Sequence, residues 1–322
     1  MGSENYPFFL KRRLIIMGFK IVFFNVLIIL IYLVIGFLLV KLKKVKSEHA
    51  KSFSGVLIYV CQPCMVINSI IQIEYSMDKM KNSGMFFIVT LILQLLLCLI
   101  LYLVLKGKMS EAKYRILILA TVSGNVGFMG LPIITALFPN NSIVSSYSTM
   151  FLVSMNLIVF TIGVYLLTNE KKYMSIKNVL TNVTSLALYV AIIIYLMQIK
   201  VPSLVSNAIG IFSKMTTPLC MIILGMRLAS MDIKETFTNK FAYVVAFCKL
   251  ILFPLFAYLI TSRLITDEVF ERSLFVLCSA PSAAIILSLA EMYECEQKLA
   301  ANILLITTIL SVITMPLLML II

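Results

Sequence analysis

The sequence has little charge and few of the side chains that most enzymes use. Only 13% of its 322 residues are charged, and its single histidine is His49; a soluble domain has about 25% charged residues. It has no G-x-S-x-G motif and no second histidine, which disfavours a Ser-His hydrolase. No second C-x-x-C accompanies Cys61 and Cys64, so no metal site or other cofactor is predicted. We therefore predict that the chain is not an enzyme.

Apolar residues dominate instead, at 61% of the chain with a mean hydropathy of +1.05. About 20 apolar residues are needed to cross a bilayer as a helix. Ten segments qualify: Lys20–Val40, Ser52–Ile73, Met85–Leu105, Ile116–Phe138, Ile143–Thr168, Asn182–Ile199, Leu204–Ala229, Phe241–Ile265, Ser273–Tyr293 and Leu299–Ile322. The sequence therefore predicts an all-α polytopic membrane protein with ten transmembrane helices.

The net charge of +13 comes from basic residues in short loops between the apolar segments. This distribution is typical of cytoplasmic loops, so we expect a lipid bilayer and no nucleic acid as a partner. Lysine and arginine are concentrated after the odd-numbered segments. The loops after the even-numbered segments hold only Lys79, Lys81, Lys200, Arg263 and Arg272. The odd-numbered loops are predicted to be cytoplasmic, with both termini outside, although Lys11, Arg12 and Arg13 near the N-terminus favour the opposite orientation.

One stretch, Thr121–Pro132, is unsuited to a continuous lipid-facing helix. Its sequence T-V-S-G-N-V-G-F-M-G-L-P contains three glycines and a proline, and each interior glycine costs roughly 1 kcal/mol relative to alanine. Non-helical backbone at membrane depth is tolerated only inside protein or beside a watery cavity. The fourth segment is therefore predicted to be a broken helix that lines a site.

A weak internal repeat pairs this stretch with a second one. A shift of 155 residues places it on Cys278–Leu287, with Asn125 on Ala280. Each unit has five segments, so the second must be inverted, and inverted repeats with matching broken helices indicate a secondary transporter. We divide the chain into a tail (1–18), a first five-helix repeat (19–168), a short cytoplasmic linker (169–182) and an inverted second repeat (183–322). Helices 4 and 9 are expected to be broken and to cross.

Half-helix N-termini at such a crossing suit an anion. The predicted substrate-binding residues at the two breaks are Ser123, Gly124, Asn125, Val126, Gly127, Ala280, Pro281 and Ser282. The alternative is that small residues merely allow close helix packing, which we prefer for Gly130.

Other residues within the segments are candidates for the cavity wall. Gln62, Asn68 and Asn156 either contact substrate or bond between helices. Lys214 and Lys249 lie inside segments, where a charge normally faces a cavity or a partner; snorkelling is the alternative. Since no well-buried acidic residue is available, an anionic substrate or half-helix C-terminal carbonyls are their expected partners.

Two further features concern shape and coupling. Pro63 and Pro218 occupy matching positions and are predicted to be structural kinks that shape the cavity wall. Glu74 and Glu291 lie at segment ends, so no side-chain proton relay is visible. Coupling to H+ or Na+ stays open, because backbone carbonyls could still bind Na+.

Several motifs resemble those of the auxin efflux carrier family. They include G-N-V-G-F-M-G-L-P-I in segment 4, S-A-P-S-A-A in segment 9 and T-T-P-L-C-M-I-I-L-G-M-R-L-A in segment 7. The resemblance covers residues 19–322 and implies a scaffold domain and a transport domain that moves like an elevator. It also implies a carboxylate substrate, such as malonate, malate or oxalate in bacterial relatives or auxin in plant ones.

The resemblance carries over to particular positions. Asn125 matches the family's crossover asparagine and Pro281 the crossover proline of the second repeat. Gly124 stands where the plant carriers have proline. The family often has Asn-Pro at the start of the sixth helix; here it is Asn182-Val183, which makes Asn182 a candidate site residue.

These observations predict a secondary transporter of a small organic carboxylate in the cytoplasmic membrane. The alternatives are a membrane sensor of the same ligand and a cation-coupled antiporter, and a homodimer is an open alternative to the monomer.

Overall fold

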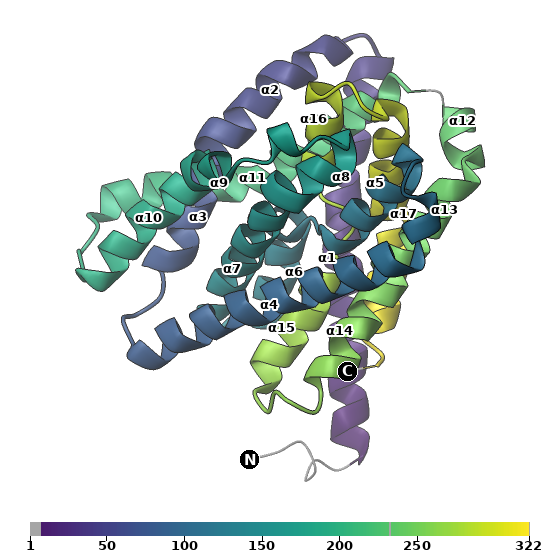
Figure 1. The fold of residues 1–322 in the computed structure, drawn as a ribbon. Helices are drawn as coiled ribbons and strands as arrows, with labels where there is room; N and C mark the ends of the chain where they lie inside the picture. Colours follow the sequence, from purple (N-terminus) through teal and green to yellow (C-terminus); the bar gives the residue numbers. More distant parts are fainter. Residues whose placement is uncertain (1–7, 232, 322) are drawn as a thin grey trace.

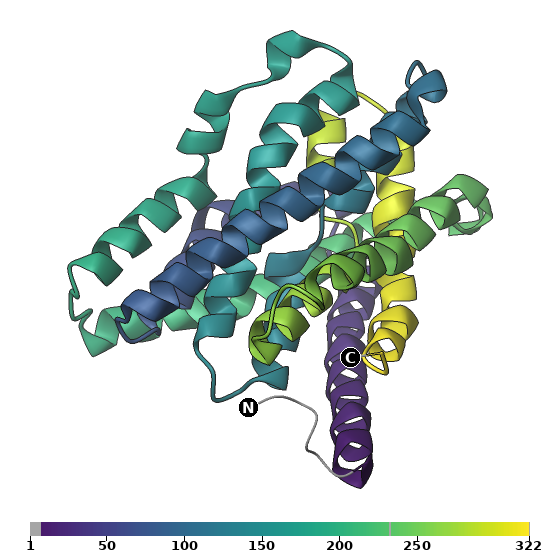
Figure 2. The ribbon, with the colours of Figure 1, turned by 60° about the horizontal axis from the view of Figure 1, so that its bottom comes forward.

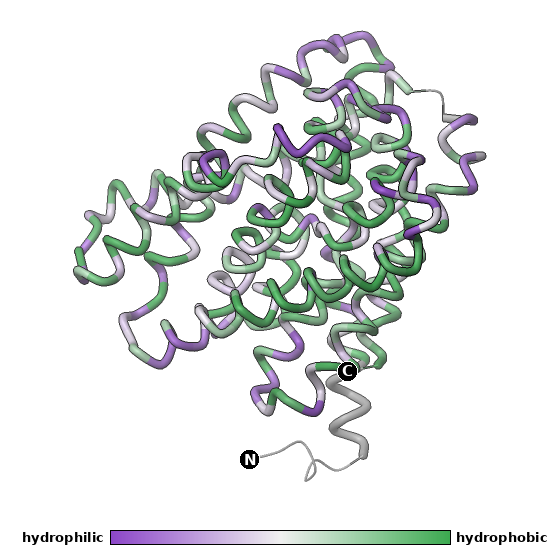
Figure 3. Tube along the Cα trace, viewed as in Figure 1, coloured by the Kyte–Doolittle hydropathy of each residue, from purple (hydrophilic) through white to green (hydrophobic). Residues whose placement is uncertain are grey.

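The computed structural model describes residues 8–231 and 233–321, and these residues form helices and no β-strand. Eight helical stretches are long and apolar enough to cross a membrane: Ile16–Lys41, Ser47–Ile71, Met77–Val104, Ile143–Thr168, Lys171–Leu196, Ser203–Ala229, Lys240–Thr261 and Gln297–Leu318. Hydrophobic residues run along these helices, and hydrophilic ones gather at the connections between them (Figure 3). The chain is therefore a multi-pass membrane protein.

Most of these stretches are built from one or two α-helices. The single helices are α1 (Phe8–Lys41), α4 (Met77–Val104), α11 (Ser203–Ala229) and α17 (Gln297–Leu318). The stretch Lys171–Leu196 contains the short helix α9 (Ile176–Thr181) followed by α10 (Val183–Leu196). Three others contain a π-helical turn between two helices: α2 (Ala50–Val56) and α3 (Gln62–Ile71), α7 (Ile143–Ile158) and α8 (Val164–Thr168), and α13 (Lys240–Phe247) and α14 (Phe253–Thr261). The short helix α12 (Ile233–Thr238) lies in a connection.

The two remaining predicted segments are each divided into two short helices. Segment Ile116–Phe138 becomes α5 (Ala112–Val122) and α6 (Leu131–Leu137), and segment Ser273–Tyr293 becomes α15 (Glu268–Ser279) and α16 (Ile285–Met292). Neither is a continuous helix long enough to span a bilayer, so ten crossings stay a prediction.

The start of the chain differs from the predicted tail. Helix α1 begins at Phe8, so much of the range 1–18 is helical, and residues 1–7 lie outside the described residues. This is expected physically, because the apolar run that begins after Arg13 favours extension of the first helix towards the N-terminus.

The helices pack into two groups. A first group contains α1, α2, α3, α10 and α11, with α11 against both α1 and α3, and α10 against α3. A second group contains α4–α8 and α13–α17, in which α4 packs on α7, α14 on α15 and α13 on α17. The α10–α11 end of the first group projects away from α13 and α17 in both views (Figures 1 and 2). Helix α1 joins the groups by also packing against α6 and α17.

Glycine permits the closest contact of the first group. A Cβ atom at Gly36 of α1 would lie 2.1 Å from the carbonyl oxygen of Ile222, and one at Gly225 of α11 would lie 1.9 Å from that of Leu33. No side chain fits in this space, so the two backbones meet directly, as small residues allow in membrane helix pairs.

We predict that Gly225→Ala destabilises the protein by about 1–3 kcal/mol, because the added methyl group forces α1 and α11 apart. The measurement is the melting temperature of the purified protein in detergent. Gly55→Ala in α2 is the matched control, since no atom lies within 4 Å of its added Cβ atom, and it should leave stability unchanged or raise it by up to about 1 kcal/mol. Equal melting temperatures for Gly225→Ala and the wild type would contradict the close contact.

Candidate functional site

The first break lies between α5 and α6. Helix α5 ends at Val122, Ser123 is extended, and helical structure resumes as a π-helical turn at Val126–Gly130. The carbonyl oxygen of Asn125 accepts hydrogen bonds from the backbone N–H groups of Met129 and Gly130, both at 3.1 Å. Asn125 therefore stands at the start of a new half-helix.

The second break lies between α15 and α16. Helix α15 ends at Ser279, and Ala280 has the extended torsions φ −60° and ψ 145°. Pro281 explains the interruption, because proline lacks an N–H group and disfavours helical torsions in the residue before it. The Ser282 hydroxyl donates to the carbonyl oxygen of Ala120 at 3.0 Å, which ties this break to α5.

The two breaks cross and satisfy each other's backbone groups. Gly124 and Ser282 form an isolated antiparallel bridge. The Asn125 N–H donates to the Pro281 carbonyl oxygen at 2.7 Å, and the Ala283 N–H donates to the Ser123 carbonyl oxygen at 3.1 Å. These bonds replace those that a continuous helix would have made, so the crossing can lie in an apolar interior.

A cavity of about 580 Å³ adjoins the crossing. Its walls include the residues at which helical structure resumes after each break, at positions 124–128 and 283–285. Of the residues predicted from sequence, those that line it are Gln62, Gly124, Asn125, Val126, Gly127, Asn156 and Asn182. The positive ends of two helix dipoles therefore face one space.

The opposite wall comes from the first group of helices. Gln62 and Thr184 line it and are joined by a hydrogen bond of 2.7 Å from Gln62 Nε2 to Thr184 Oγ1. Asn182 caps α10, accepting a hydrogen bond from the Ser185 N–H at 3.0 Å. The cavity thus lies between the two helix groups.

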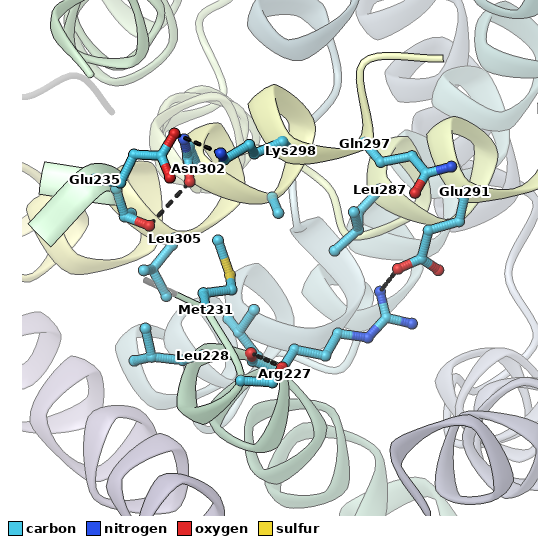
Figure 4. A pocket seen from close by; sticks show the side chains of 14 residues that line it. Arg227, Leu228, Met231, Glu235, Leu287, Glu291, Gln297, Lys298, Asn302 and Leu305 are labelled. Atoms are coloured by element: carbon cyan, nitrogen blue, oxygen red, sulfur yellow. Dashed lines mark hydrogen bonds and ion pairs between the residues drawn. The ribbon is translucent and has the colours of Figure 1, made fainter. Parts of the chain in front are cut away.

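Among the residues that the structure describes, Arg227 in the last turn of α11 is the only charged side chain that lines this cavity. Sequence reasoning missed it, because its place at the end of a segment assigned it to a cytoplasmic loop. Its Nη1 lies 3.0 Å from Glu291 Oε1 of α16, and the two side chains point toward each other in Figure 4. The pair joins the first helix group to the second.

Arg227 also borders a second, more polar cavity of about 470 Å³ (Figure 4). Lys298 and Glu235 form an ion pair there, with 2.5 Å between Nζ and Oε1. Thr236 Oγ1 donates to Asn302 Oδ1 at 3.0 Å. The polar groups of this second cavity are thus largely engaged with one another.

Two polar atoms at the crossing have no partner among the described residues. They are Asn125 Nδ2 and Ser123 Oγ, and their residues are 4% and 0% exposed. Buried polar atoms are nearly always hydrogen-bonded in native structures. Since Asn125 also lines the cavity, its amide is a donor ready for a bound acceptor.

The other predicted residues do not line the cavity. Ala280, Pro281 and Ser282 are buried in the crossing itself. Lys214 is exposed on α11, and Asn68 is half-buried and accepts a hydrogen bond from Gln72 Nε2 at 3.1 Å.

Lys249 is fully buried, and its Nζ donates to the Cys278 carbonyl oxygen at 3.2 Å. This places it at the C-terminal end of α15 and not in the cavity. Of the two predicted kinks, Pro63 is the second residue after the π-helical turn Leu57–Cys61, whereas Pro218 lies within the uninterrupted helix α11.

Comparison with known proteins indicates a family of membrane transporters. The model of a family described as "Membrane transport protein" matches residues 21–186 and 172–319. An uncharacterized transporter of Methanocaldococcus jannaschii is 26% identical over 307 residues, which cover 91% of this chain and 96% of the relative. The chain therefore belongs to the membrane transport protein family, that of the auxin efflux carriers.

Proposed function

We propose that the protein is a secondary transporter that moves a small organic carboxylate across the cytoplasmic membrane. The observation that carries the proposal is the convergence of two half-helix N-termini, the Arg227 guanidinium and the unsatisfied Asn125 amide on one cavity. Each of these groups attracts an anion or donates a hydrogen bond to it. A volume of about 580 Å³ lies within the usual range for small-ligand sites.

The architecture that we propose has ten crossings in two inverted five-helix repeats, at 19–168 and 183–322. In this arrangement the broken segments supply the fourth and ninth crossings. The support is that the two breaks, at Ser123–Asn125 and Ala280–Ala284, lie about 155 residues apart and meet as an antiparallel pair.

The proposed motion is of the elevator type. The first helix group would act as scaffold, and the second group, which contains both breaks, would carry the substrate. The position of the cavity between the groups supports this division. Its lining includes Ser54, Thr181 and Met292 at the ends that adjoin the odd-numbered loops. If those loops are cytoplasmic and the termini outside, the cavity faces the cytoplasm.

Flux measurements test the proposal directly. Proteoliposomes that contain the purified protein should accumulate at least one acid from a panel of mono- and dicarboxylates under an imposed gradient, while protein-free liposomes should not. Absence of flux for the whole panel would refute transport. Stabilisation by an acid without any flux would instead favour a membrane sensor.

We predict that Asn125→Ala weakens binding of the transported acid about 10- to 100-fold. The variant removes a buried donor to a charged acceptor, an interaction of about 1.5–3 kcal/mol. Its melting temperature should stay close to that of the wild type, because Nδ2 has no partner within the described protein. Binding is measured by ligand-dependent stabilisation. Asn68→Ala, away from the cavity, is the control; an unchanged affinity of Asn125→Ala would remove this residue from the site.

We also predict that Arg227→Gln weakens binding at least tenfold, because it removes the one charged side chain that lines the cavity within the described chain. Glu291→Gln should instead bind up to about fivefold more tightly, since it frees Arg227 from a partly exposed ion pair of at most about 1 kcal/mol. Lys298→Gln is the control: Lys298 lines the second cavity and not the first, so this variant should bind like the wild type. Both affinities are measured from ligand-dependent shifts of the melting temperature. If Glu291→Gln lost binding and Arg227→Gln did not, Arg227 would not be the anion-binding residue of the pair.

A further inference from the structure

Lys249 is a buried lysine without an acidic partner. It lies in the π-helical turn Cys248–Leu252 between α13 and α14, and it is 0% exposed. No ion pair involves it in the part of the chain that the structure describes. Its contacts are the Cys278 carbonyl oxygen, at 3.2 Å, and the face of the Phe253 ring, 4.5 Å from Nζ to the centroid. A buried charge in this position requires compensation from its surroundings.

The compensation comes from the C-terminal ends of the broken helices. Cys278 lies in the last turn of α15, where carbonyl groups lack partners within the helix. The aligned peptide dipoles place about half a negative charge at such an end. The first break is equally close, because a Cβ atom at Gly124 would lie only 3.1 Å from Nζ. The ammonium group therefore lies in the crossing, on the side where the first half-helices end.

The corresponding residue of the first half is Gln94, 155 positions earlier. It is also 0% exposed, and its Nε2 donates to the Val122 carbonyl oxygen at 3.3 Å, at the end of α5. The two long side chains thus cap the two half-helices in the same way. Because a neutral amide is sufficient at one end, the hydrogen bond alone does not explain a positive charge at the other.

We propose that the Lys249 ammonium is a built-in cation of the crossing, which occupies the position that a monovalent metal ion would otherwise take. Half-helix C-terminal carbonyls are common ligands of Na+ in transporters with broken helices, and here the lysine ammonium would provide that charge. The crossing then has a positive charge behind the half-helix N-termini, and the protein binds its anion without bound Na+. The role in anion binding rests on the proposed function, whereas the occupation of the cation position does not.

The first test needs no substrate. Melting temperatures of the wild type and of Lys249→Ala are compared in NaCl and in choline chloride at equal ionic strength. The wild type should melt at the same temperature in both salts. Lys249→Ala should be stabilised by Na+ by about 2 °C or more, because a ligand that binds only the folded state raises its stability. Lys214→Gln, an exposed lysine on α11, is the control and should not respond to Na+.

Two results of this test would overturn the proposal: stabilisation of the wild type by Na+, or no response of Lys249→Ala. If Lys249→Ala does not fold, Lys249→Gln replaces it, since it copies Gln94 and keeps the hydrogen bond to Cys278. With Lys249→Gln in place of Lys249→Ala, the same two results would overturn the proposal.

The second test separates charge from hydrogen bonding. Lys249→Gln should fold like the wild type but bind the transported acid at least tenfold more weakly in Na+-free buffer, with part of the affinity restored by NaCl. Wild-type affinity of Lys249→Gln without Na+ would show that the charge is dispensable and overturn the proposal. If no carboxylate is bound or moved by the wild type, the proposed function fails, and the salt comparison still decides the role of Lys249.

Discussion

The structure depends on the backbone bonds that the two broken helices exchange. The Asn125 N–H bonds to the Pro281 carbonyl oxygen, and the Ala283 N–H bonds to the Ser123 carbonyl oxygen. An unsatisfied backbone group in an apolar interior costs several kcal/mol, so neither break is stable without the other. These bonds hold α5, α6, α15 and α16 in the same helix group, so in the proposed elevator motion the two breaks would move together.

This exchange of bonds also places the positive N-terminal ends and the negative C-terminal ends of the half-helices on different sides of the crossing. The half-helices that begin at residues 126 and 285 point their positive ends into the large cavity. The ends of α5 and α15 meet Gln94 and Lys249 instead. The same geometry explains Gly124, where the plant carriers are expected to have proline. A Cβ atom here would lie 3.1 Å from Lys249 Nζ, so glycine leaves the lysine more room than a residue with a side chain would.

The sequence predicted the breaks and the candidate residues at them, because glycine, proline and asparagine in an apolar run have few other uses. It could not tell Lys214 from Lys249, since both lie within spans and the face that each occupies is set by packing. Helix α11 leaves Lys214 exposed, while the π-helical turn in the segment of Lys249 directs that side chain inward. Arg227 was missed for a similar reason: a residue at a segment end is assigned to a loop unless the neighbouring helices that enclose it are known.

The positions of the charges bear on how a carried anion could be released. Arg227 belongs to the first helix group, the proposed scaffold, whereas Asn125 and both half-helix N-termini belong to the second group, which is proposed to move. An acid bound to both would tie the groups together and oppose the motion that it needs. Glu291 of α16 already pairs with Arg227, and an exposed pair of this kind is weak enough to exchange with a ligand. In the proposed mechanism Arg227 is therefore suited to attract the anion at the cavity entrance, and the crossing, whose donors belong to one helix group, is suited to carry it.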